Sequence, residues 1–404
     1  GRGDGMSMHP PPANGWSPRA GYRRTAYPAA AAGPSSLTEW TPQVASARRH
    51  SLIATAVLGV LGGLGLLIML VVVYLSTGEA SRLLTPVLLA AVPLTIVLGT
   101  VRWIDRWEPE PVGILAAAFL WGAGVATVVS LVVNTSTSSL VVSSTGSSSG
   151  AEFFSSVVSA PLVEESTKGL GVLLIFLVWR RSFSGPVDGI VYACVVAAGF
   201  AFAENVLYFA TYSDQIVSIF IMRGILSPFA HVTFTACTGL AIGASSRMRS
   251  SLAWIWTTPL GLVCAIVLHA FWNGVIGQAQ VLYFLIEVPF FIGWVGLVVW
   301  LRWSERMNIR ARLSDYQRAG WYGSAEIMML TTSSGRSAAV RWARSRGPQA
   351  LSAMKTFLTT SAALAQLRQQ ALDGHAEADF ATREAALLRT VSSTRRVFTG
   401  VGPV

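Results

Sequence analysis

The chain has 404 residues, of which 52% are hydrophobic and only 12% are charged, and its formal net charge is +10. Soluble domains carry roughly twice that charged fraction, so the composition excludes an ordinary soluble protein and indicates a chain built mostly for lipid. The three cysteines all fall in apolar runs without CxxC spacing, which argues against a disulfide framework. The excess of positive charge has to be explained by its placement along the chain before nucleic acid is considered.

The first 50 residues are rich in Pro, Gly and Ala without periodicity, and they predict a disordered arm. Eight near-continuous apolar stretches follow, each long enough to cross a bilayer about 30 Å thick. They cover residues 52–75, 83–101, 112–133, 152–179, 187–211, 216–246, 252–276 and 281–301. The first stretch begins too late and is too long for a cleaved signal peptide. We therefore predict an all-α, polytopic transmembrane helical bundle of about eight spans over residues 51–301.

Positive charge alternates between the segments that join these spans. The basic segments contain Arg48 and Arg49, Arg102 and Arg106, Arg180 and Arg181, Arg247 and Arg249, and Arg302 and Arg306. The other segments, such as the Ser/Thr/Gly run at 134–150, which is predicted as a loop, have almost none. Because basic loops stay in the cytoplasm, the pattern predicts an integral protein of a bacterial plasma membrane with both termini cytoplasmic. The net charge is then a topology signal, and no nucleic-acid partner is expected.

Residues 302–404 are predicted to form a cytoplasmic, basic, helical tail. Its part from about 348 to 393 is rich in Ala, Leu, Arg and Glu, and its leucines recur at helical spacing. An interruption near Asp373 and Gly374 predicts a soluble helical hairpin. Docking, regulation and solubility are alternative roles that this pattern does not separate.

Ionisable and amide side chains inside spans four to seven are the candidates for function, because such groups are costly to place in lipid. They are Glu164, Glu165, Lys168, Glu204, Asn205, Arg223, His231, His269 and Asn273. A helix rises 1.5 Å per residue, so depth can be counted from the nearest basic segment or loop. Glu164, Glu204, His231 and His269 then lie roughly 24 to 30 Å from the cytoplasmic edge of the membrane. Four consecutive helices are therefore predicted to bring these groups to one level.

Adjacent Glu164 and Glu165 point about 100° apart on a helix, so one can face a cavity while the other pairs with a cation. Lys168 and Arg223 are interpreted as those charge partners. A carboxyl group in an apolar wall is suited to exchange a proton with water, which makes Glu164 or Glu165 the candidate general base. The residues leave open which of the two it is.

The histidines and one asparagine complete the predicted site. His231, His269 and Asn273 can donate hydrogen bonds to a developing oxyanion. Two histidines with glutamates can also bind zinc, although no HExxH motif places two histidines on one helix. We expect a water activated by glutamate without a cofactor, and zinc held by Glu164, Glu204, His231 and His269 is the alternative.

The order of these motifs carries a family resemblance. They read Pro161-Leu-Val-Glu164-Glu165-x-x-Lys168, Asp188-Gly189, Phe200-x-x-x-Glu204-Asn205-x-x-Tyr208, Pro228-x-x-His231-x-x-Phe-Thr and His269-x-x-x-Asn273. Residues 95–300 thereby resemble the PrsW-type intramembrane proteases, which are distantly similar to the prenyl-protein CAAX endopeptidases. Where this chain has Glu204, the CAAX pattern has a histidine.

The resemblance implies an endopeptidase that cleaves membrane-associated proteins, and in bacteria such enzymes are associated with the cutting of anti-sigma factors. It also implies that Glu164, Glu165, Glu204, His231 and His269 form the active site. Asn205 and Asn273 would support them. The expected partners are therefore a membrane-protein substrate and the lipid bilayer.

Other classes fit the same residues less well. A proton- or ion-coupled transporter also uses buried Glu, His and Lys, but the spans show no two-half symmetry and the polar residues concentrate in spans four to seven. A catalytically inactive scaffold is disfavoured by the complete motif set. The absence of GxSxG and Gly-x-Gly-Asp motifs argues against serine and aspartyl proteases.

Overall fold

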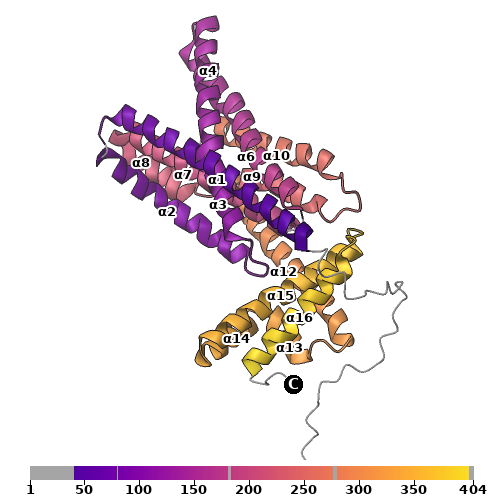
Figure 1. Ribbon diagram of the computed structural model, residues 1–404. Coiled ribbons are helices and arrows are strands. Elements are labelled where there is room, and N and C mark those ends of the chain that lie inside the picture. The colour runs from indigo at the N-terminus through magenta and orange to yellow at the C-terminus, as the bar shows by residue number, and fades with distance from the viewer. Residues whose placement is uncertain (1–40, 80, 181–182, 276–279, 400–404) are drawn as a thin grey trace, which may run out of the picture.

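The protein is described by a computed structural model over residues 41–79, 81–180, 183–275 and 280–399 (Figure 1). Among these residues there are helices and no strands, so the predicted all-α fold is confirmed. Helix α1 begins at Thr41, and the end of the predicted disordered arm is therefore helical. The rest of that arm lies outside the described residues.

The helices of the bundle follow one another in chain order with short connections. They are α1 (Thr41–Thr77), α2 (Ser81–Ile104), α3 (Val112–Leu120), η2 (Trp121–Ala126), α4 (Thr127–Thr145), α5 (Ser148–Phe154), η3 (Ser155–Ser159), α6 (Ala160–Val178), α7 (Pro186–Thr211), η5 (Ser213–Gln215), α8 (Ile216–Phe220), η6 (Ile221–Leu226), α9 (Ala230–Ser245), α10 (Trp254–Gly274), α11 (Gln280–Leu282), η8 (Tyr283–Glu287) and α12 (Val288–Arg318). The segments η2, η3, η6 and η8 are π-helical turns, and η5 is a 3₁₀ turn.

Seven stretches of the described chain are long and apolar enough to cross a membrane. They are Ser51–Ser76, Arg82–Ile104, Val112–Thr145, Pro186–Thr211, Ser213–Ser245, Trp254–Gly274 and Tyr283–Arg318. The remaining predicted span, 152–179, is also helical, because α5, η3 and α6 follow one another without a break. It carries three charged side chains close together, Glu164, Glu165 and Lys168. These three residues belong to the predicted chemistry.

The prediction of a loop over 134–150 is wrong for most of that run. Helix α4 continues to Thr145 and projects beyond the rest of the bundle (Figure 1). Its hydroxyl groups bond the preceding turn, as where Thr145 Oγ1 donates to the carbonyl of Val141 at 2.7 Å, so Ser and Thr remain compatible with a helix here. The helix ends only at Gly146, whose φ of +70° is the left-handed conformation that glycine adopts at helix ends.

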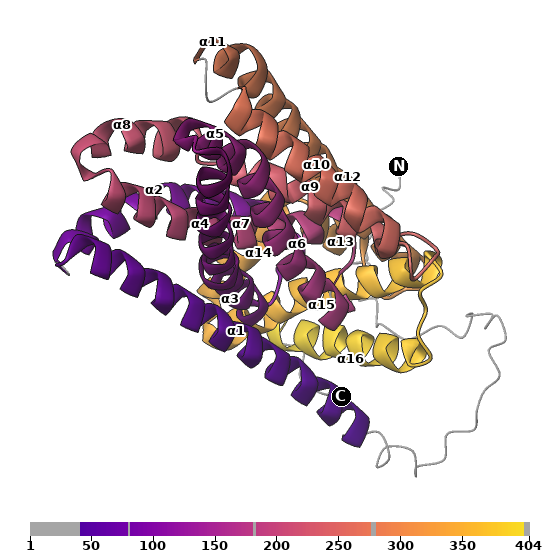
Figure 2. The ribbon, with the colours of Figure 1, turned by 90° about the horizontal axis from the view of Figure 1, so that it is seen from above.

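Helix α7 lies at the centre of the bundle, where it contacts α2, α3, α6 and α9 (Figure 2), and almost every side chain from Val187 to Phe200 is buried. Glycines allow its neighbours to approach closely. A Cβ added at Gly189 would lie 2.0 Å from the carbonyl oxygen of Gly239 on α9, and one added at Gly199 would lie 2.1 Å from that of Phe119 on α3. Helix–helix packing in membranes depends on such small residues. Helix α7 is therefore fixed between α9 and α3.

The sixth predicted span, 216–246, is broken in the structure. Helix α8 and η6 end at Leu226, and α9 begins at Ala230. Pro228 lacks the N–H that a continuing helix needs and disfavours a helical conformation for Ser227, whose φ is −130°. The break places His231 in the first turn of α9. Irregular backbone at membrane depth is tolerated where protein covers it, as in broken transporter helices.

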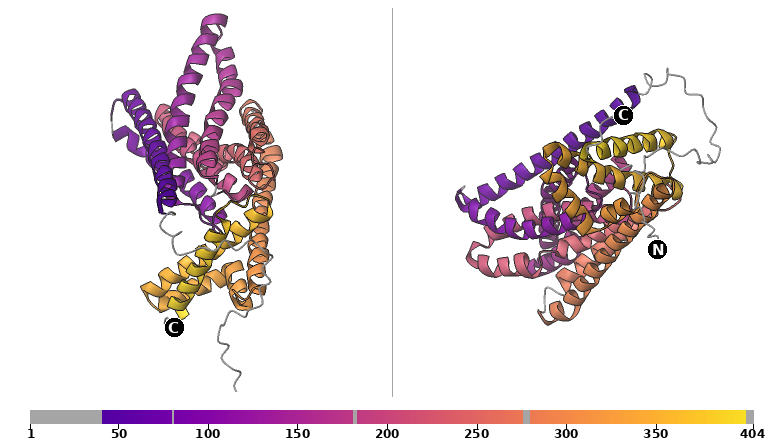
Figure 3. Two further views of the ribbon diagram at one scale, coloured as in Figure 1. Left: turned by 45° about the vertical axis from the view of Figure 1, so that its right-hand side comes forward. Right: turned by 90° about the horizontal axis from the view of Figure 1, so that it is seen from below.

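The C-terminal region contains four further helices. They are α13 (Ser324–Thr331), α14 (Ser333–Ser345), α15 (Pro348–Leu372) and α16 (Phe380–Thr399). Helices α15 and α16 pack against each other, and the chain turns near Asp373 and Gly374, where the sequence predicts an interruption (Figure 3). Helix α12 runs from the bundle into this region without a break, so the domain boundary predicted at 301 falls inside a helix.

The C-terminal helices rest on one end of the bundle. Arg336 of α14 is only 9% exposed and donates to the carbonyl of Trp107 at 3.0 Å, and its guanidinium lies over the Trp107 ring. His375 Nε2 lies 2.6 Å from the carbonyl oxygen of Met248, which follows α9. The loops after α2 and α9, both basic, therefore lie on the same side as the C-terminal helices.

Two acidic side chains of the loop between α2 and α3 are buried at this end. Asp105 accepts two hydrogen bonds from the backbone N–H of Glu110 at 3.1 Å, and the Tyr192 hydroxyl donates to the Glu110 carboxyl group. Burial raises the pKa of Asp105 to about 7. Burial and the nearby charge of Asp188 raise the pKa of Glu110 to about 10.

These two pKa shifts predict a pH-dependent stability. The folded chain keeps protons that the unfolded chain releases above its ordinary carboxyl pKa, so stability falls as pH rises, by at most about 1.4 kcal/mol per pH unit for each proton. We expect the thermal unfolding midpoint in detergent to decrease from pH 5 to pH 9. Glu110→Gln, which resembles the protonated form, should flatten this decrease. A wild-type midpoint that rises over the same range would contradict the prediction.

The close contact of α7 with α9 predicts that Gly189→Ala is destabilising. The added methyl group has no room beside the Gly239 carbonyl, so the helices must separate, and overpacking of this kind costs about 1 to 3 kcal/mol. Gly63→Ala in α1 is the matched control, because within the described chain nothing lies within 4 Å of a Cβ added there. Unfolding midpoints of the two variants in detergent test this, and equal midpoints would refute it.

Candidate active site

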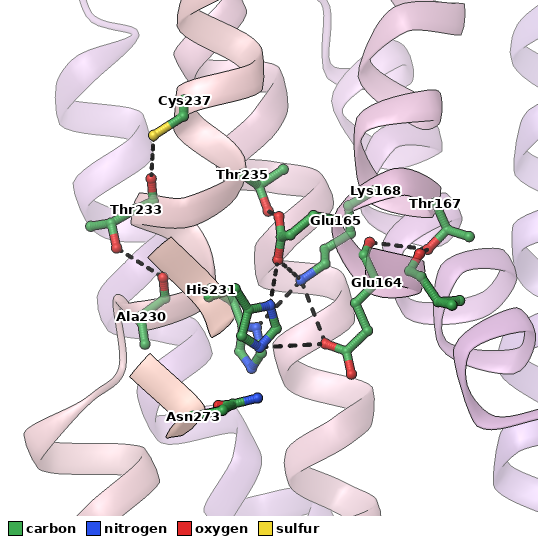
Figure 4. Close-up of polar contacts among 12 residues, drawn as sticks. Glu164, Glu165, Thr167, Lys168, Ala230, His231, Thr233, Thr235, Cys237 and Asn273 are labelled. Atoms are coloured by element: carbon green, nitrogen blue, oxygen red, sulfur yellow. Dashed lines mark hydrogen bonds and ion pairs between the residues drawn. The ribbon is translucent and has the colours of Figure 1, made fainter. Parts of the chain in front are cut away.

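Helices α6, α7, α9 and α10 and the turn η6 bring the predicted polar residues to one place inside the bundle. Figure 4 shows Glu164, Glu165 and Lys168 of α6 beside His231 of α9. The side chains that meet there are Glu164, Glu165, Lys168, Glu204, Asn205, Arg223, His231 and His269. Glu165 and Lys168 are completely inaccessible to solvent. The cluster is thus a buried ionic network, and each of its charges needs a partner.

Glu165 is fully occupied by hydrogen bonds from three side chains. Its Oε1 accepts from Lys168 Nζ at 2.6 Å and lies 2.9 Å from His269 Nδ1. Its Oε2 accepts from the Thr235 hydroxyl at 2.8 Å. Because an ionised carboxylate can only accept, Nδ1 of His269 carries the proton and its Nε2 has a free lone pair. Glu165 therefore orients His269.

Glu204 orients the second histidine in the same way. His231 Nε2 lies 2.9 Å from Glu204 Oε2, and Arg223 donates to the same oxygen. Arg223 also donates through Nε to Asn205 Oδ1 at 2.7 Å and stacks over the Tyr208 ring. Nε2 of His231 is consequently the protonated nitrogen, and the lone pair on Nδ1 faces Lys168 Nζ, 3.3 Å away. Asn205 therefore positions Arg223, and Arg223 in turn positions Glu204.

Glu164 differs from the other two glutamates. Its Oε2 is buried and has no hydrogen-bond partner among the described residues. This oxygen lies 4.0 Å from His269 Nε2 and 3.8 Å from Lys168 Nζ. An unbonded carboxylate oxygen in an apolar interior is expensive, so it indicates a position where a further group binds.

The arrangement suits a metal ion. Glu164, His231 and His269 each offer one ligand atom, and these atoms all lie within 4.8 Å of one another. A glutamate and two histidines, each histidine held by a carboxylate through its other nitrogen, is a usual donor set for catalytic zinc. Glu204, which was included in the predicted metal set, is bound by Arg223 and His231 instead.

The charges of the cluster do not balance. Three carboxylates face the two permanent cations Lys168 and Arg223, so one negative charge is left when both imidazoles are neutral. Coulomb energies are large at low dielectric, and the excess has to be removed by a bound cation or by a proton. The unbonded oxygen of Glu164 is where either would be held.

Sequence reasoning missed one member of the network and misplaced another. Thr235 was not singled out, although it lies four residues after His231 and so on the same face of α9. Asn273, predicted as an oxyanion donor, uses its Nδ2 to donate to the carbonyl of Ser156 at 2.7 Å. It joins α10 to η3 and makes no hydrogen bond within the cluster as described.

Comparison with known proteins supports the resemblance that the motifs indicate. Residues 110–295 match the family described as PrsW family intramembrane metalloproteases. Relatives named Protease PrsW occur in Clostridioides difficile (33% identical over 156 residues, 38% of this chain and 63% of the relative) and Bacillus subtilis (28% over 149 residues, 37% and 66%). A third, in Geobacillus kaustophilus, is 31% identical over 159 residues, 39% of this chain and 65% of the relative.

The chain thus spans slightly less than two thirds of the length of the curated relatives it matches. No solved structure matches it. The matched segment contains every member of the polar cluster, and the predicted resemblance to the PrsW-type proteases is confirmed.

The hydrogen bond from Thr235 to Glu165 predicts a stability effect. Thr235→Val keeps the shape of the side chain but leaves Glu165 Oε2 without its donor, which costs about 1.5 to 3 kcal/mol for a charged acceptor. We expect a lower unfolding midpoint in detergent, whereas Thr235→Ser, which keeps the hydroxyl, should behave as the wild type. A Thr235→Val midpoint equal to that of Thr235→Ser would show that the bond does not contribute.

Proposed function

We propose that this chain, whose residues 110–295 match the PrsW family, is an intramembrane endopeptidase that hydrolyses peptide bonds of membrane-associated proteins. The observation that carries the proposal is the unbonded Oε2 of Glu164, which lies beside His269 within a network that is otherwise satisfied. A transporter would not require two histidines whose rings are both oriented by carboxylates through their protonated nitrogens.

The donor set supports a metal-dependent reaction. Glu164, His231 and His269 would hold the ion, and a divalent metal there would polarise the scissile carbonyl and the attacking water. The family to which the residues match is described as a metalloprotease family. This differs from our expectation of a glutamate acting without a cofactor, and a water activated by Glu164 alone is the outcome that a chelator experiment would distinguish.

The chain's own residues position and move protons. Glu165 and Glu204 fix the tautomers of His269 and His231, and Lys168 and Arg223 keep those carboxylates ionised. In the alternative without a metal, where Oε2 of Glu164 is not a ligand, Glu164 would accept a proton from water while the water oxygen bonds to the carbonyl carbon. That proton passes to the departing amine as the C–N bond breaks, which leaves a carboxylic acid and an amine.

The surroundings of His231 leave room for a substrate. A cavity of about 250 Å³ is lined by Phe229 and Ala230 at the start of α9, by Trp272 of α10 and by Tyr283. The cavity reaches Ala230, the residue before His231, and we propose that an extended peptide segment approaches the histidines from it. The backbone of a substrate would have to be extended here, because helical peptide bonds are shielded by their own hydrogen bonds.

Substrate class and orientation are part of the same proposal. Anti-sigma factors with a membrane span are the substrates that the resemblance implies. The basic loops after α2 and α9 and the C-terminal helices lie at one end of the bundle, as seen for Arg336 on Trp107. The positive-inside rule then places that end, and both termini, in the cytoplasm of a bacterial plasma membrane.

The test is cleavage of reconstituted single-span substrates. We expect Glu164→Gln, His231→Ala and His269→Ala each to lower the cleavage rate about 100-fold or more, because each removes a group at the reacting centre. Glu152→Gln is the matched control, a glutamate on the same continuous helical segment but exposed and outside the cluster. Variants that fold and cleave at the wild-type rate would refute the proposal. Loss of cleavage with chelator, restored by zinc, would support the metal.

A further inference from the structure

Lys168 is the most deeply buried cation in the described chain, with no solvent exposure. Its Nζ lies 2.6 Å from Glu165 Oε1, 3.3 Å from His231 Nδ1 and 3.8 Å from Glu164 Oε2, and 4.2 Å from the centre of the Phe200 ring. The ammonium group thus touches two of the three side chains that would hold a metal. Neutralising Glu165 does not require a contact with His231, so the second contact of Lys168 needs its own explanation.

The tautomer of His231 leaves one lone pair on the ring, and Lys168 contacts the nitrogen that carries it. Its Nε2–H donates to Glu204, so Nδ1 has the only free lone pair on the ring. Lys168 Nζ, which has three N–H donors and no acceptor, donates to that lone pair. Glu204, itself held by Arg223, contacts the other side of the ring, and the ring cannot turn to offer Nε2 without breaking that contact.

A metal ion would need the same lone pair. Of the ligand atoms available, His269 Nε2 is free and Glu164 Oε2 is unbonded, but His231 Nδ1 is already engaged. One lone pair cannot serve an ammonium and a metal together, and two cations in such proximity also repel. Lys168 has another position available to it, because Glu165 and the face of Phe200 hold it independently of His231.

We propose that Lys168 is a built-in cation of this site, which occupies His231 Nδ1 when no metal is bound and competes directly with a divalent metal for that nitrogen. Metal binding then requires the ammonium to withdraw to Glu165 and Phe200. The lysine keeps the ligands charged and ordered in the empty enzyme, and it lowers the affinity for metal. This inference rests on the proposed metal site and adds to it a residue that opposes metal binding.

The experiment measures zinc affinity of the purified full chain in detergent after metal removal, by competition with a chromophoric chelator. Lys168→Met keeps the length of the side chain and removes the charge and the donors. We expect it to bind zinc at least about tenfold more tightly than the wild type, and zinc to raise its unfolding midpoint by more. Lys168→Gln, which removes the charge but keeps N–H donors, is measured if the methionine variant does not fold, and it should also bind zinc more tightly than the wild type.

Two further variants make the outcomes distinct. Glu164→Gln should weaken zinc binding, and if it does not, the proposed metal site itself fails. If Glu164→Gln weakens binding while Lys168→Met binds zinc equally or more weakly than the wild type, the lysine only positions Glu165 and our inference is overturned. Arg223→Met removes a positive charge that does not touch the three ligands, and an equal gain there would show a general charge effect and would also overturn it.

Discussion

The burial of ionised groups in the interior of a membrane bundle is the constraint on which the rest of this structure depends. Glu164 and Glu165 are buried and the Glu204 side chain is only 15% exposed, so an unpaired charge there would cost several kcal/mol or more. Two of the three are therefore surrounded by donors, Glu165 by Lys168 of its own helix and by Thr235 of α9, and Glu204 by Arg223 of η6. These partners come from different helices, so the network also fixes how α6, α7 and α9 lie against one another.

The same constraint explains why the backbone is so close-packed around α7. Fixed charges are useful only if their helices cannot slide, and the glycine contacts at Gly189 and Gly199 bring α9 and α3 close enough to hold α7 in register. The break before Ala230 has the opposite effect, because it gives up helical hydrogen bonds inside the membrane. It places His231 at a helix start beside a cavity, where a continuous helix would have presented only a smooth apolar surface.

Much of this could be predicted from the sequence, because membrane spans and intramembrane charges leave strong signals. The apolar stretches and the common depth of Glu164, Glu204 and His269 follow from composition and from 1.5 Å per residue. The loop at 134–150 was predicted wrongly because Ser and Thr resemble loop residues, while in a helix their hydroxyls bond the preceding turn. The break at Pro228 was overlooked because mean hydropathy is insensitive to a single proline.

The choice between Glu164 and Glu165 could not be made from the sequence, and its physical reason lies in tertiary contacts. Lys168 follows Glu165 by three residues and Glu164 by four, and either spacing permits an ion pair on a helix. The two glutamates are distinguished by contacts from two other helices. Thr235 and His269 both reach Glu165, and Lys168 donates to it as well, so the hydrogen-bonding capacity of this carboxylate is used within the network. Two adjacent glutamates with one lysine thus provide one carboxylate saturated by hydrogen bonds and one, Glu164, whose Oε2 has no hydrogen-bond partner among the described residues.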